Sequence, residues 1–283
     1  MVSTLWLGAV LALQAVPAPA PEMHTVTVAV TDSRGEAVTG LTAQDVAVVE
    51  NGVARDVARF ELDQRPLTVA VLVDTSEVMS SALRLHLVDG VNALLKALPD
   101  GTRYAVWCTG DRPQKIVDYT DDRALAGKAL KRAFTQGGNT VLDALVEASR
   151  DLKKQEGSRS AVIALTGLGP EFSSRTRYRV VEEAHGNADV FSTLSIDEGQ
   201  APFDTRTSYE YALTRLATLS GGLHERIVSS MGASAGLRKL AADLRGHYLL
   251  SYVTEPGGKE RKIEVQVARP RTKVRLAATP GRQ

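Results

Sequence analysis

The chain has 283 residues, of which 43% are hydrophobic and 24% are charged, the ordinary composition of a folded globular protein. Its 34 Lys and Arg residues nearly balance its 33 Asp and Glu residues, so the composition does not indicate a basic surface for nucleic acid. Only 5% of the chain is aromatic, which also argues against a surface on which bases stack. The single cysteine, Cys108, excludes an intramolecular disulfide, and its apolar neighbours predict a buried side chain rather than a nucleophile.

Residues 1–20 have the pattern of a secretory signal. Residues 5–16 are nearly all apolar, and small residues follow, with Ala18 and Ala20 spaced as at a cleavage site. An apolar stretch of this length is too short to cross a bilayer as a mature helix. We therefore predict a signal peptide over residues 1–20, either cleaved or kept as an anchor, and a mature chain without a membrane span.

Residues 21–65 are predicted to form the first part of a small β unit. Residues 24–30 alternate in the way typical of a strand, and residues 46–49 form a second. Asn51 and Gly52 predict a tight turn, and residues 53–62 a returning strand.

Between residues 66 and 246, predicted strands alternate with predicted helices. The strands are short apolar runs of the kind buried inside a parallel sheet, at 67–73, 103–108, 161–165, 189–194 and 223–228. The helices show apolar residues at helical spacing or capping signals, at 83–98, 121–134, 139–154, 177–184, 209–219 and 237–244. This alternation predicts an α/β fold with a doubly wound, mostly parallel sheet, whose ligands bind beyond the carboxyl ends of the strands.

Residues 247–283 return to a β pattern, with strands predicted at 248–253, 262–267 and 273–276. We expect them to join the N-terminal strands in a single sheet, because each group is too small to be stable alone. Arg271, Lys273 and Arg275 alternate along the last strand and are expected to form a solvated face that protects a sheet edge.

Four segments, taken in order, resemble the von Willebrand factor A (vWA) family. They are the Asp74-Thr-Ser76-Glu-Val78 loop, the Gly137-Gly-Asn-Thr140 loop before Asp143, the Thr166-Gly167 pair that ends a buried strand, and residues 244–270. The first three are similar to the D-x-S-x-S, Gly-Gly-Thr and Thr-Asp-Gly loops of the family. The last is similar to the tail of a bacterial subgroup in which a small β unit flanks the domain on both sides. The resemblance implies a vWA, Rossmann-like fold and a periplasmic, secreted or envelope-anchored bacterial protein.

The resemblance also implies a Mg²⁺ site in these loops, with one position left for a carboxylate of a partner protein. Mg²⁺ takes about six oxygen ligands. Asp74 and Ser76 are in place, but Val78 and Gly167 stand where the family has a second serine and an aspartate. Two of the expected ligands are therefore replaced, and the metal site is degenerate.

The threonine position of the family is also changed. Alignment on Asp143 puts Asn139 at that position and Thr140 beside it, while Glu77 could supply a compensating carboxylate. Because Mg²⁺ requires ligand number as well as charge, we predict a surface that works without a metal. In the alternative, Asp74, Ser76 and Thr140 would hold Mg²⁺.

We predict a non-enzymatic protein-binding or cell-adhesion module that acts through the loops at the carboxyl end of the sheet. The expected surface consists of Asp74, Ser76, Glu77, Asn139, Thr140 and Arg175. Arg175, together with Arg177 and Arg179, could receive an acidic partner protein. The first alternative is a Mg²⁺-dependent vWA adhesin.

The second alternative is a serine hydrolase. Residues 232–236 match the G-x-S-x-G pattern around Ser234, and Asp243 and His247 follow in the order of a catalytic triad. All three lie on or beside one predicted helix, whereas a triad draws its members from separate loops. A serine that caps the helix is the simpler interpretation, so we predict that the chain is not an enzyme.

Overall fold

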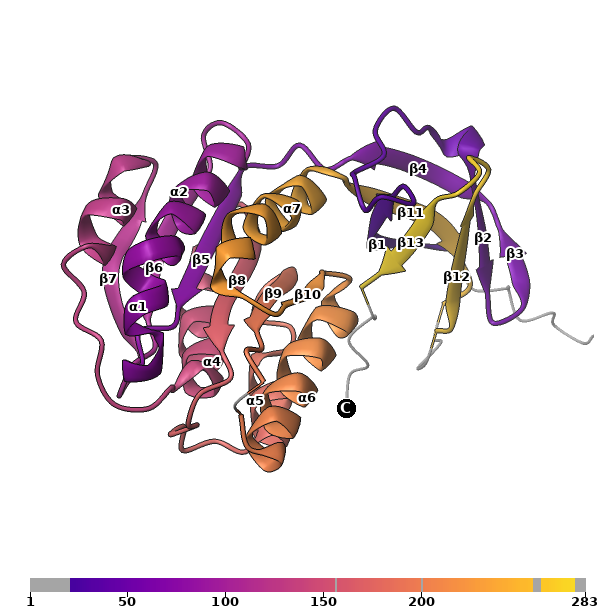
Figure 1. Cartoon of the computed structure of the whole chain (residues 1–283). Coiled ribbons are helices and arrows are strands. Elements are labelled where there is room, and N and C mark those ends of the chain that lie inside the picture. Colours follow the sequence, from indigo (N-terminus) through magenta and orange to yellow (C-terminus); the bar gives the residue numbers. More distant parts are fainter. Residues whose placement is uncertain (1–20, 156, 200, 257–260, 278–283) are drawn as a thin grey trace, which may run out of the picture.

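The computed structural model describes residues 21–155, 157–199, 201–256 and 261–277. The predicted signal peptide, residues 1–20, lies outside the described residues. The described chain forms an α/β domain with a smaller all-β unit beside it (Figure 1). Within the described part, no helix is both long and apolar enough to span a bilayer.

A six-stranded sheet forms the centre of the α/β domain, in the order β10-β9-β8-β5-β6-β7. Its strands are β5 (Leu67–Val73), β6 (Arg103–Cys108), β7 (Gln114–Thr120), β8 (Arg159–Gly167), β9 (Val190–Ile196) and β10 (His224–Ile227). All neighbouring strands are parallel except β6 and β7. Because the chain adds β6 on one side of β5 and β8 on the other, its winding direction reverses beside β5, where sheets of this class bind ligands.

Helices cover both faces of this sheet, as its apolar strands require. One face carries α1 (Ser80–Ala82), α2 (Val88–Ala97), α3 (Ala124–Leu130) and α7 (Ala233–Arg245), and the other carries α4 (Val141–Leu152), α5 (Arg177–Ala184) and α6 (Phe203–Ser220). A π-helical segment, Leu83–Leu87, joins α1 to α2 within the predicted helix. Every residue of β5 is buried, so successive side chains enter the two cores alternately. The predicted doubly wound fold is confirmed.

β7 was not predicted from the sequence. It is an antiparallel edge strand in which only Val117 is buried, and Lys115 and Asp118 interrupt its apolar pattern. An edge strand with polar side chains lacks the continuous apolar run that identifies a central parallel strand.

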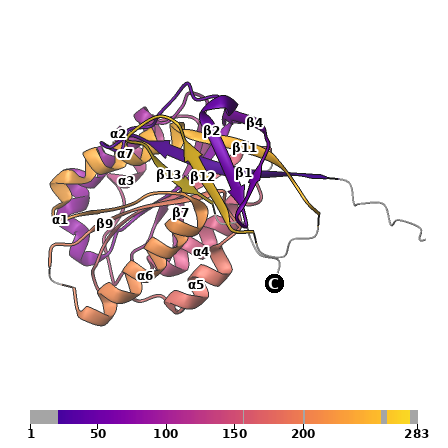
Figure 2. The same cartoon turned by 90° about the vertical axis from the view of Figure 1, so that its right-hand side faces the viewer.

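The N-terminal and C-terminal strands form one β unit, as predicted, but in two small sheets rather than one (Figure 2). One has the order β13-β1-β11-β4 and the other β12-β2-β3. The strands are β1 (Glu22–Thr31), β2 (Val46–Glu50), β3 (Val53–Arg55), β4 (Val57–Leu62), β11 (His247–Thr254), β12 (Ile263–Val267) and β13 (Lys273–Leu276). The returning strand predicted over 53–62 divides at Asp56, so that β3 and β4 pair in different sheets. Two layers let the alternating apolar side chains of both sheets share one core.

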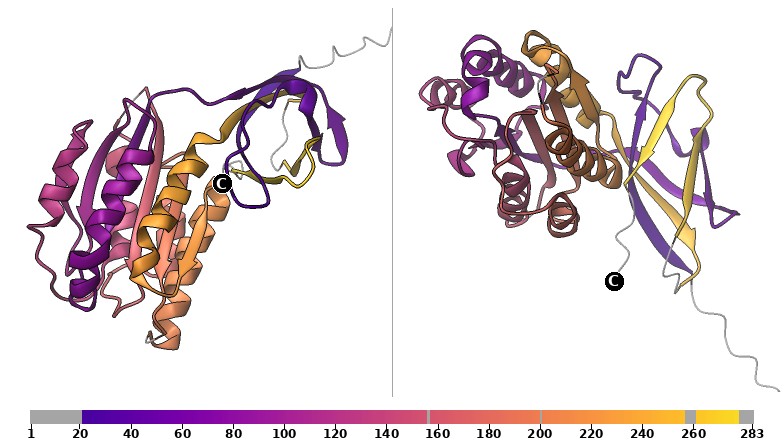
Figure 3. Two further views of the ribbon diagram at one scale, coloured as in Figure 1. Left: turned by 45° about the horizontal axis from the view of Figure 1, so that its top comes forward. Right: turned by 60° about the horizontal axis from the view of Figure 1, so that its bottom comes forward.

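A buried carboxylate, Asp243 on α7, joins the β unit to the α/β domain. Arg275 on β13 donates to Oδ1 of Asp243, and His247 on β11 lies 3.4 Å from Oδ2. Arg275 also donates to the carbonyl oxygen of Gly221, which follows α6, at 3.3 Å. The expectation that Arg275 is a solvated edge residue was therefore wrong, because its guanidinium neutralises a buried charge. The β unit meets the α/β domain at the amino end of the parallel strands and leaves the other end uncovered (Figure 3).

Glu50 is the buried charge of the β unit, at 2% exposure. It accepts hydrogen bonds from Arg261 at 2.8 Å, Tyr252 at 3.0 Å, Arg55 at 3.1 Å and the hydroxyl of Thr254. Burial by itself would raise the pKa of Glu50, but the hydrogen bonds from Thr254, Arg261 and Tyr252 outweigh it and hold the pKa at about 2. Because the donors come from both sheets, this carboxylate ties the two layers together.

We expect Glu50→Gln to lower the free energy of unfolding by about 3 kcal/mol at pH 7, since each pKa unit corresponds to about 1.4 kcal/mol. The pKa is depressed in the folded state, so the stabilisation is complete above the unfolded value of 4.5 and is lost as the pH falls toward 2. Urea denaturation between pH 7 and pH 3 measures this. The matched control is Glu61→Gln, which removes an exposed ion pair with Arg59 and should change stability by less than about 1 kcal/mol. A loss that does not shrink toward pH 3 would contradict the assignment.

Candidate functional site

The predicted site residues lie where the parallel strands end, at the lower end of the α/β domain in Figure 1. Asp74 and Ser76 follow β5, Gly167 ends β8, and Asn139 and Thr140 precede α4. The structure brings Asp74, Ser76, Asn139 and Gly167 into direct contact. We call this end of the sheet, with its loops, the carboxyl edge.

Asp74 is fully buried and lies at the centre of this group. Its Oδ1 accepts a hydrogen bond from the backbone N–H of Ser76 at 2.9 Å, and its Oδ2 accepts one from the backbone N–H of Gly167 at 2.8 Å. The hydroxyl of Thr166 lies 3.3 Å from the same oxygen. Burial raises the pKa of Asp74, and the hydrogen bonds from Ser76, Gly167 and Thr166 offset part of that rise.

The carboxamide of Asn139 completes the shell around Asp74. Its Nδ2 lies 2.7 Å from Oδ2 of Asp74 and 2.6 Å from the hydroxyl oxygen of Thr166. Its Oδ1 accepts hydrogen bonds from the hydroxyl of Thr109 and from the backbone N–H of Val141, both at 2.9 Å. A backbone N–H can only donate, so the oxygen must face Val141 and the nitrogen must face the carboxylate. The Asn139 amide thus presents a hydrogen-bond donor to Asp74, where a metal site would need a ligand oxygen.

The other positions implied for a metal do not supply the missing ligands. The hydroxyl of Thr140 donates to the carbonyl oxygen of Thr109 at 2.9 Å, and Val78 is 60% exposed. A Cβ atom at Gly167 would overlap Sδ of Met79, so an aspartate at this position would require the Met79 side chain to move.

A single hydroxyl remains from the implied ligand set. Oγ of Ser76 is buried and has no hydrogen-bond partner among the described residues. No cluster of three or more His, Cys, Asp or Glu side chains is placed to hold a metal in the described part of the chain. One hydroxyl and a carboxylate already bound by N–H groups do not fit the six-oxygen shell of Mg²⁺.

Two charged residues of the predicted surface lie away from Asp74. Glu77 is exposed at the start of the turn after Ser76. Arg175 donates to Asp143 at 2.9 Å and to Glu183 at 3.1 Å. Its charge is therefore compensated within the chain, and the expectation that it is free to receive an acidic partner was wrong. Asp143 also accepts backbone hydrogen bonds from residues 174 and 175, so this predicted cluster is a brace for the loop before α5.

Neither candidate nucleophile is activated. Ser234 lies in the first turn of α7 and Asp243 near its end, roughly 13 Å apart along the helix axis. The carboxylate of Asp243 is bound by Arg275 and contacts His247, so these three residues form an internal cluster that does not include the serine. Burial raises the pKa of the Cys108 thiol to about 11, which leaves it protonated at neutral pH.

Comparison with known proteins agrees with this geometry. A family model described as "von Willebrand factor type A domain" matches residues 69–170, which include Asp74, Asn139 and Gly167. A solved structure, "von Willebrand factor type A from Catenulispora acidiphila", has a TM-score of 0.54 and 14% identity, covering 94% of this chain and 74% of that one. Residues 69–170 therefore belong to a von Willebrand factor type A domain. No curated protein matches the chain.

A second structural likeness is to proximal thread matrix protein 1 from the mussel byssus, in a form with a zinc-occupied MIDAS motif. It has a TM-score of 0.51 and 15% identity, covering 69% of this chain and 50% of that one. At such identities the likeness shows the fold alone. The vWA domain in general suggests a module for protein–protein interaction or adhesion.

The carboxyl edge of the vWA domain also carries exposed apolar side chains that were not singled out from the sequence. The four most exposed large hydrophobic side chains of the described residues all lie in its loops or in the first turn after them: Phe134 at 86%, Phe203 at 81%, Val228 at 79% and Met231 at 77%. Their signal in the sequence is weak, because exposure cannot be told from the identity of an apolar residue.

A groove of about 340 Å³ lies beside the Asp74 group. It runs between the turn after β5, the loop after β8 and the start of α6. Its apolar lining includes Val78, Met79, Leu168, Pro170, Ile196 and Pro202. The charged residues in its lining are both acidic, Asp197 and Glu198.

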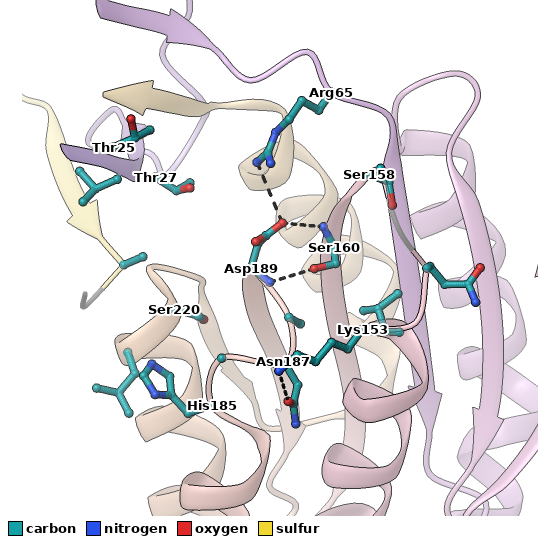
Figure 4. A pocket seen from close by; sticks show the side chains of 18 of the residues that line it. Thr25, Thr27, Arg65, Lys153, Ser158, Ser160, His185, Asn187, Asp189 and Ser220 are labelled. Atoms are coloured by element: carbon teal, nitrogen blue, oxygen red, sulfur yellow. Dashed lines mark hydrogen bonds and ion pairs between the residues drawn. The ribbon is translucent and has the colours of Figure 1, made fainter. Parts of the chain in front are cut away.

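A larger cleft, of about 530 Å³, lies between the β unit and the opposite end of the vWA sheet (Figure 4). Asp189 there accepts a hydrogen bond from the backbone of Ser160 at 2.9 Å and lies 4.0 Å from Arg65. Lys153 donates to Asn187 at 3.2 Å. Asp189 and Lys153 thus have partners within the chain, whereas Nε2 of His24 and Oγ of Ser158 have none among the described residues. We place the candidate site at the carboxyl edge, because the loops matched by sequence meet there.

We expect Asn139→Ala to lower the free energy of unfolding by about 2 to 4 kcal/mol, because it removes an N–H donor from a buried carboxylate. The folded pKa of Asp74 lies above its ordinary value of 3.8, so ionisation opposes folding, and the deficit should grow as the pH rises through the folded pKa and Asp74 loses its proton. Urea denaturation at pH 4 and pH 7 measures both effects. The control, Thr140→Val, loses a hydrogen bond between neutral groups and should cost about 1 kcal/mol at either pH. Equal losses in the two variants would refute a special role for Asn139.

Proposed function

We propose that this chain is an exported, non-enzymatic protein-binding module that docks its partner on the carboxyl edge of its vWA domain, without a bridging metal ion. The observation that carries the proposal is that the four most exposed large hydrophobic side chains of the described residues, Phe134, Phe203, Val228 and Met231, all lie in the loops of this edge or in the first turn after them. Large apolar side chains exposed on one edge of a domain favour a protein interaction surface there, and aromatic residues buried at an interface supply much of its binding energy.

Three further observations support the metal independence, the lack of catalysis and the export that the proposal includes. The Asn139 amide satisfies Asp74 without a cation, which supports docking without a metal. The isolated Ser234 and the protonated Cys108 support a role without catalysis. The apolar residues 5–16, followed by Ala18 and Ala20, support export.

The metal-independent part is tested by a thermal melt of the mature protein in EDTA and then in rising Mg²⁺ or Mn²⁺. We expect no shift of Tm up to millimolar concentrations. A bound ion at a hundred times its Kd would add about 2.7 kcal/mol and raise Tm by several degrees. A saturable rise that disappears in Asp74→Ala would contradict the proposal and favour the Mg²⁺-dependent adhesin.

The docking surface is tested by capturing a partner from an extract of cells that produce the protein. We expect Phe203→Ser and Val228→Ser each to reduce the captured amount at least about fivefold, since each removes an apolar anchor. The matched control is Met23→Ser, which changes a side chain of similar exposure, 65%, on β1 in the β unit. Loss of capture in Met23→Ser, with the two edge variants unaffected, would move the docking surface to the β unit.

A further inference from the structure

The groove beside Asp74 is apolar inside and acidic at its rim. Val78 and Pro202 are among its apolar lining residues, and Phe203, at 81% exposure, directly follows Pro202. A hollow of this size admits one large side chain of a partner, and the neighbouring phenylalanine adds apolar surface beside it.

The charges around the groove do not cancel. Asp197 is paired with Arg206 and Arg226, each at 3.3 Å. Glu198 on the lining and Glu77 next to Val78 are exposed, and neither forms an ion pair among the described residues. Arg206 and Arg226 are therefore already engaged, and two carboxylates without an ion pair among the described residues remain, Glu198 in the lining and Glu77 beside the lining residue Val78.

Because the Asn139 amide binds Asp74 where a cation would otherwise lie, the carboxyl edge attracts partners of a different charge. A bound Mg²⁺ would attract an acidic group of a partner to the carboxyl edge. Asn139 carries no net charge, and the Asp74 carboxylate that it binds is fully buried, so the exposed Glu77 and Glu198 add negative charge that no bound cation offsets. An acidic partner is repelled from this groove and a basic one is attracted.

We propose that the groove binds a partner segment that presents an apolar side chain next to Lys or Arg. The inference rests on the proposed docking function and names the chemistry of the segment that docks. The apolar side chain fills the groove between the turn after β5 and the start of α6, and the cation lies against Glu77 and Glu198.

The experiment selects binders from a library of random heptapeptides displayed on phage, with the mature protein immobilised. We expect the enriched sequences to place Leu, Ile, Phe or Met beside Lys or Arg. The best peptide is then synthesised with a fluorescent label, and its Kd is measured by fluorescence anisotropy at low and at physiological salt. Salt should weaken binding, because the charged contacts lie at an exposed rim.

Three variants test the contacts separately. Reversing both rim charges, with Glu77→Lys and Glu198→Lys together, should raise the Kd at least fivefold. Ala201→Trp fills the groove from its α6 side and should abolish binding, with a thermal melt as the check on folding. The matched control is Asp121→Lys, an exposed charge reversal before α3 at the opposite end of the sheet, which should change the Kd less than twofold.

Two outcomes overturn the inference, and they differ in what they leave standing. Enrichment of Asp- or Glu-rich peptides that Ala201→Trp still abolishes would show the groove to be a docking site for acidic segments, so that the proposed function stands and the basic partner falls. Enriched peptides that respond to neither the rim variant nor Ala201→Trp would remove the groove from both proposals.

Discussion

The buried contact between Asp74 and Asn139 organises the carboxyl edge of the vWA domain. The Asp74 carboxylate is fully buried, so its charge must be met by donors from the chain or by a cation. Here the donors are the backbone of Ser76, the backbone of Gly167 and the amide of Asn139. Because these come from three separate loops, one carboxylate fixes the relative position of β5, β8 and the start of α4.

Because hydrogen bonds within the chain satisfy Asp74, the carboxyl edge presents other groups to a partner than a metal site would. The polar residues that the family motif singles out are turned inward, and Asp74, Ser76 and Asn139 are each fully buried. The exposed groups near Asp74 include apolar and acidic side chains, such as Phe203 and Glu198. An edge of this kind recognises a partner through shape, apolar contact and the sign of its charge, rather than through a shared metal ion.

The β unit leaves this edge accessible. It is joined to the other end of the vWA sheet through Asp243, Arg275 and His247, and its own two sheets are tied together by Glu50. In both places a buried carboxylate is paired with arginine and joins elements that are far apart in the sequence. Asp243 joins α7 to β13, and Glu50 joins β2 to β11. Chain segments from both ends of the protein thus support one domain, whose loops at the opposite end of the sheet are free for contact.

The sequence by itself determined the alternation of strands and helices and the doubly wound sheet, because these follow from the local spacing of apolar residues. It also predicted that the two terminal β segments join, because each is too small to be stable alone. It also located the loop at Asp74 and the losses at Val78 and Gly167. It did not determine that Asn139 turns its nitrogen to Asp74, that Arg175 is engaged by Asp143, or that Arg275 crosses to Asp243. Those outcomes depend on which groups meet across loops separated by tens of residues, and only the packed structure decides which buried charge each donor must satisfy.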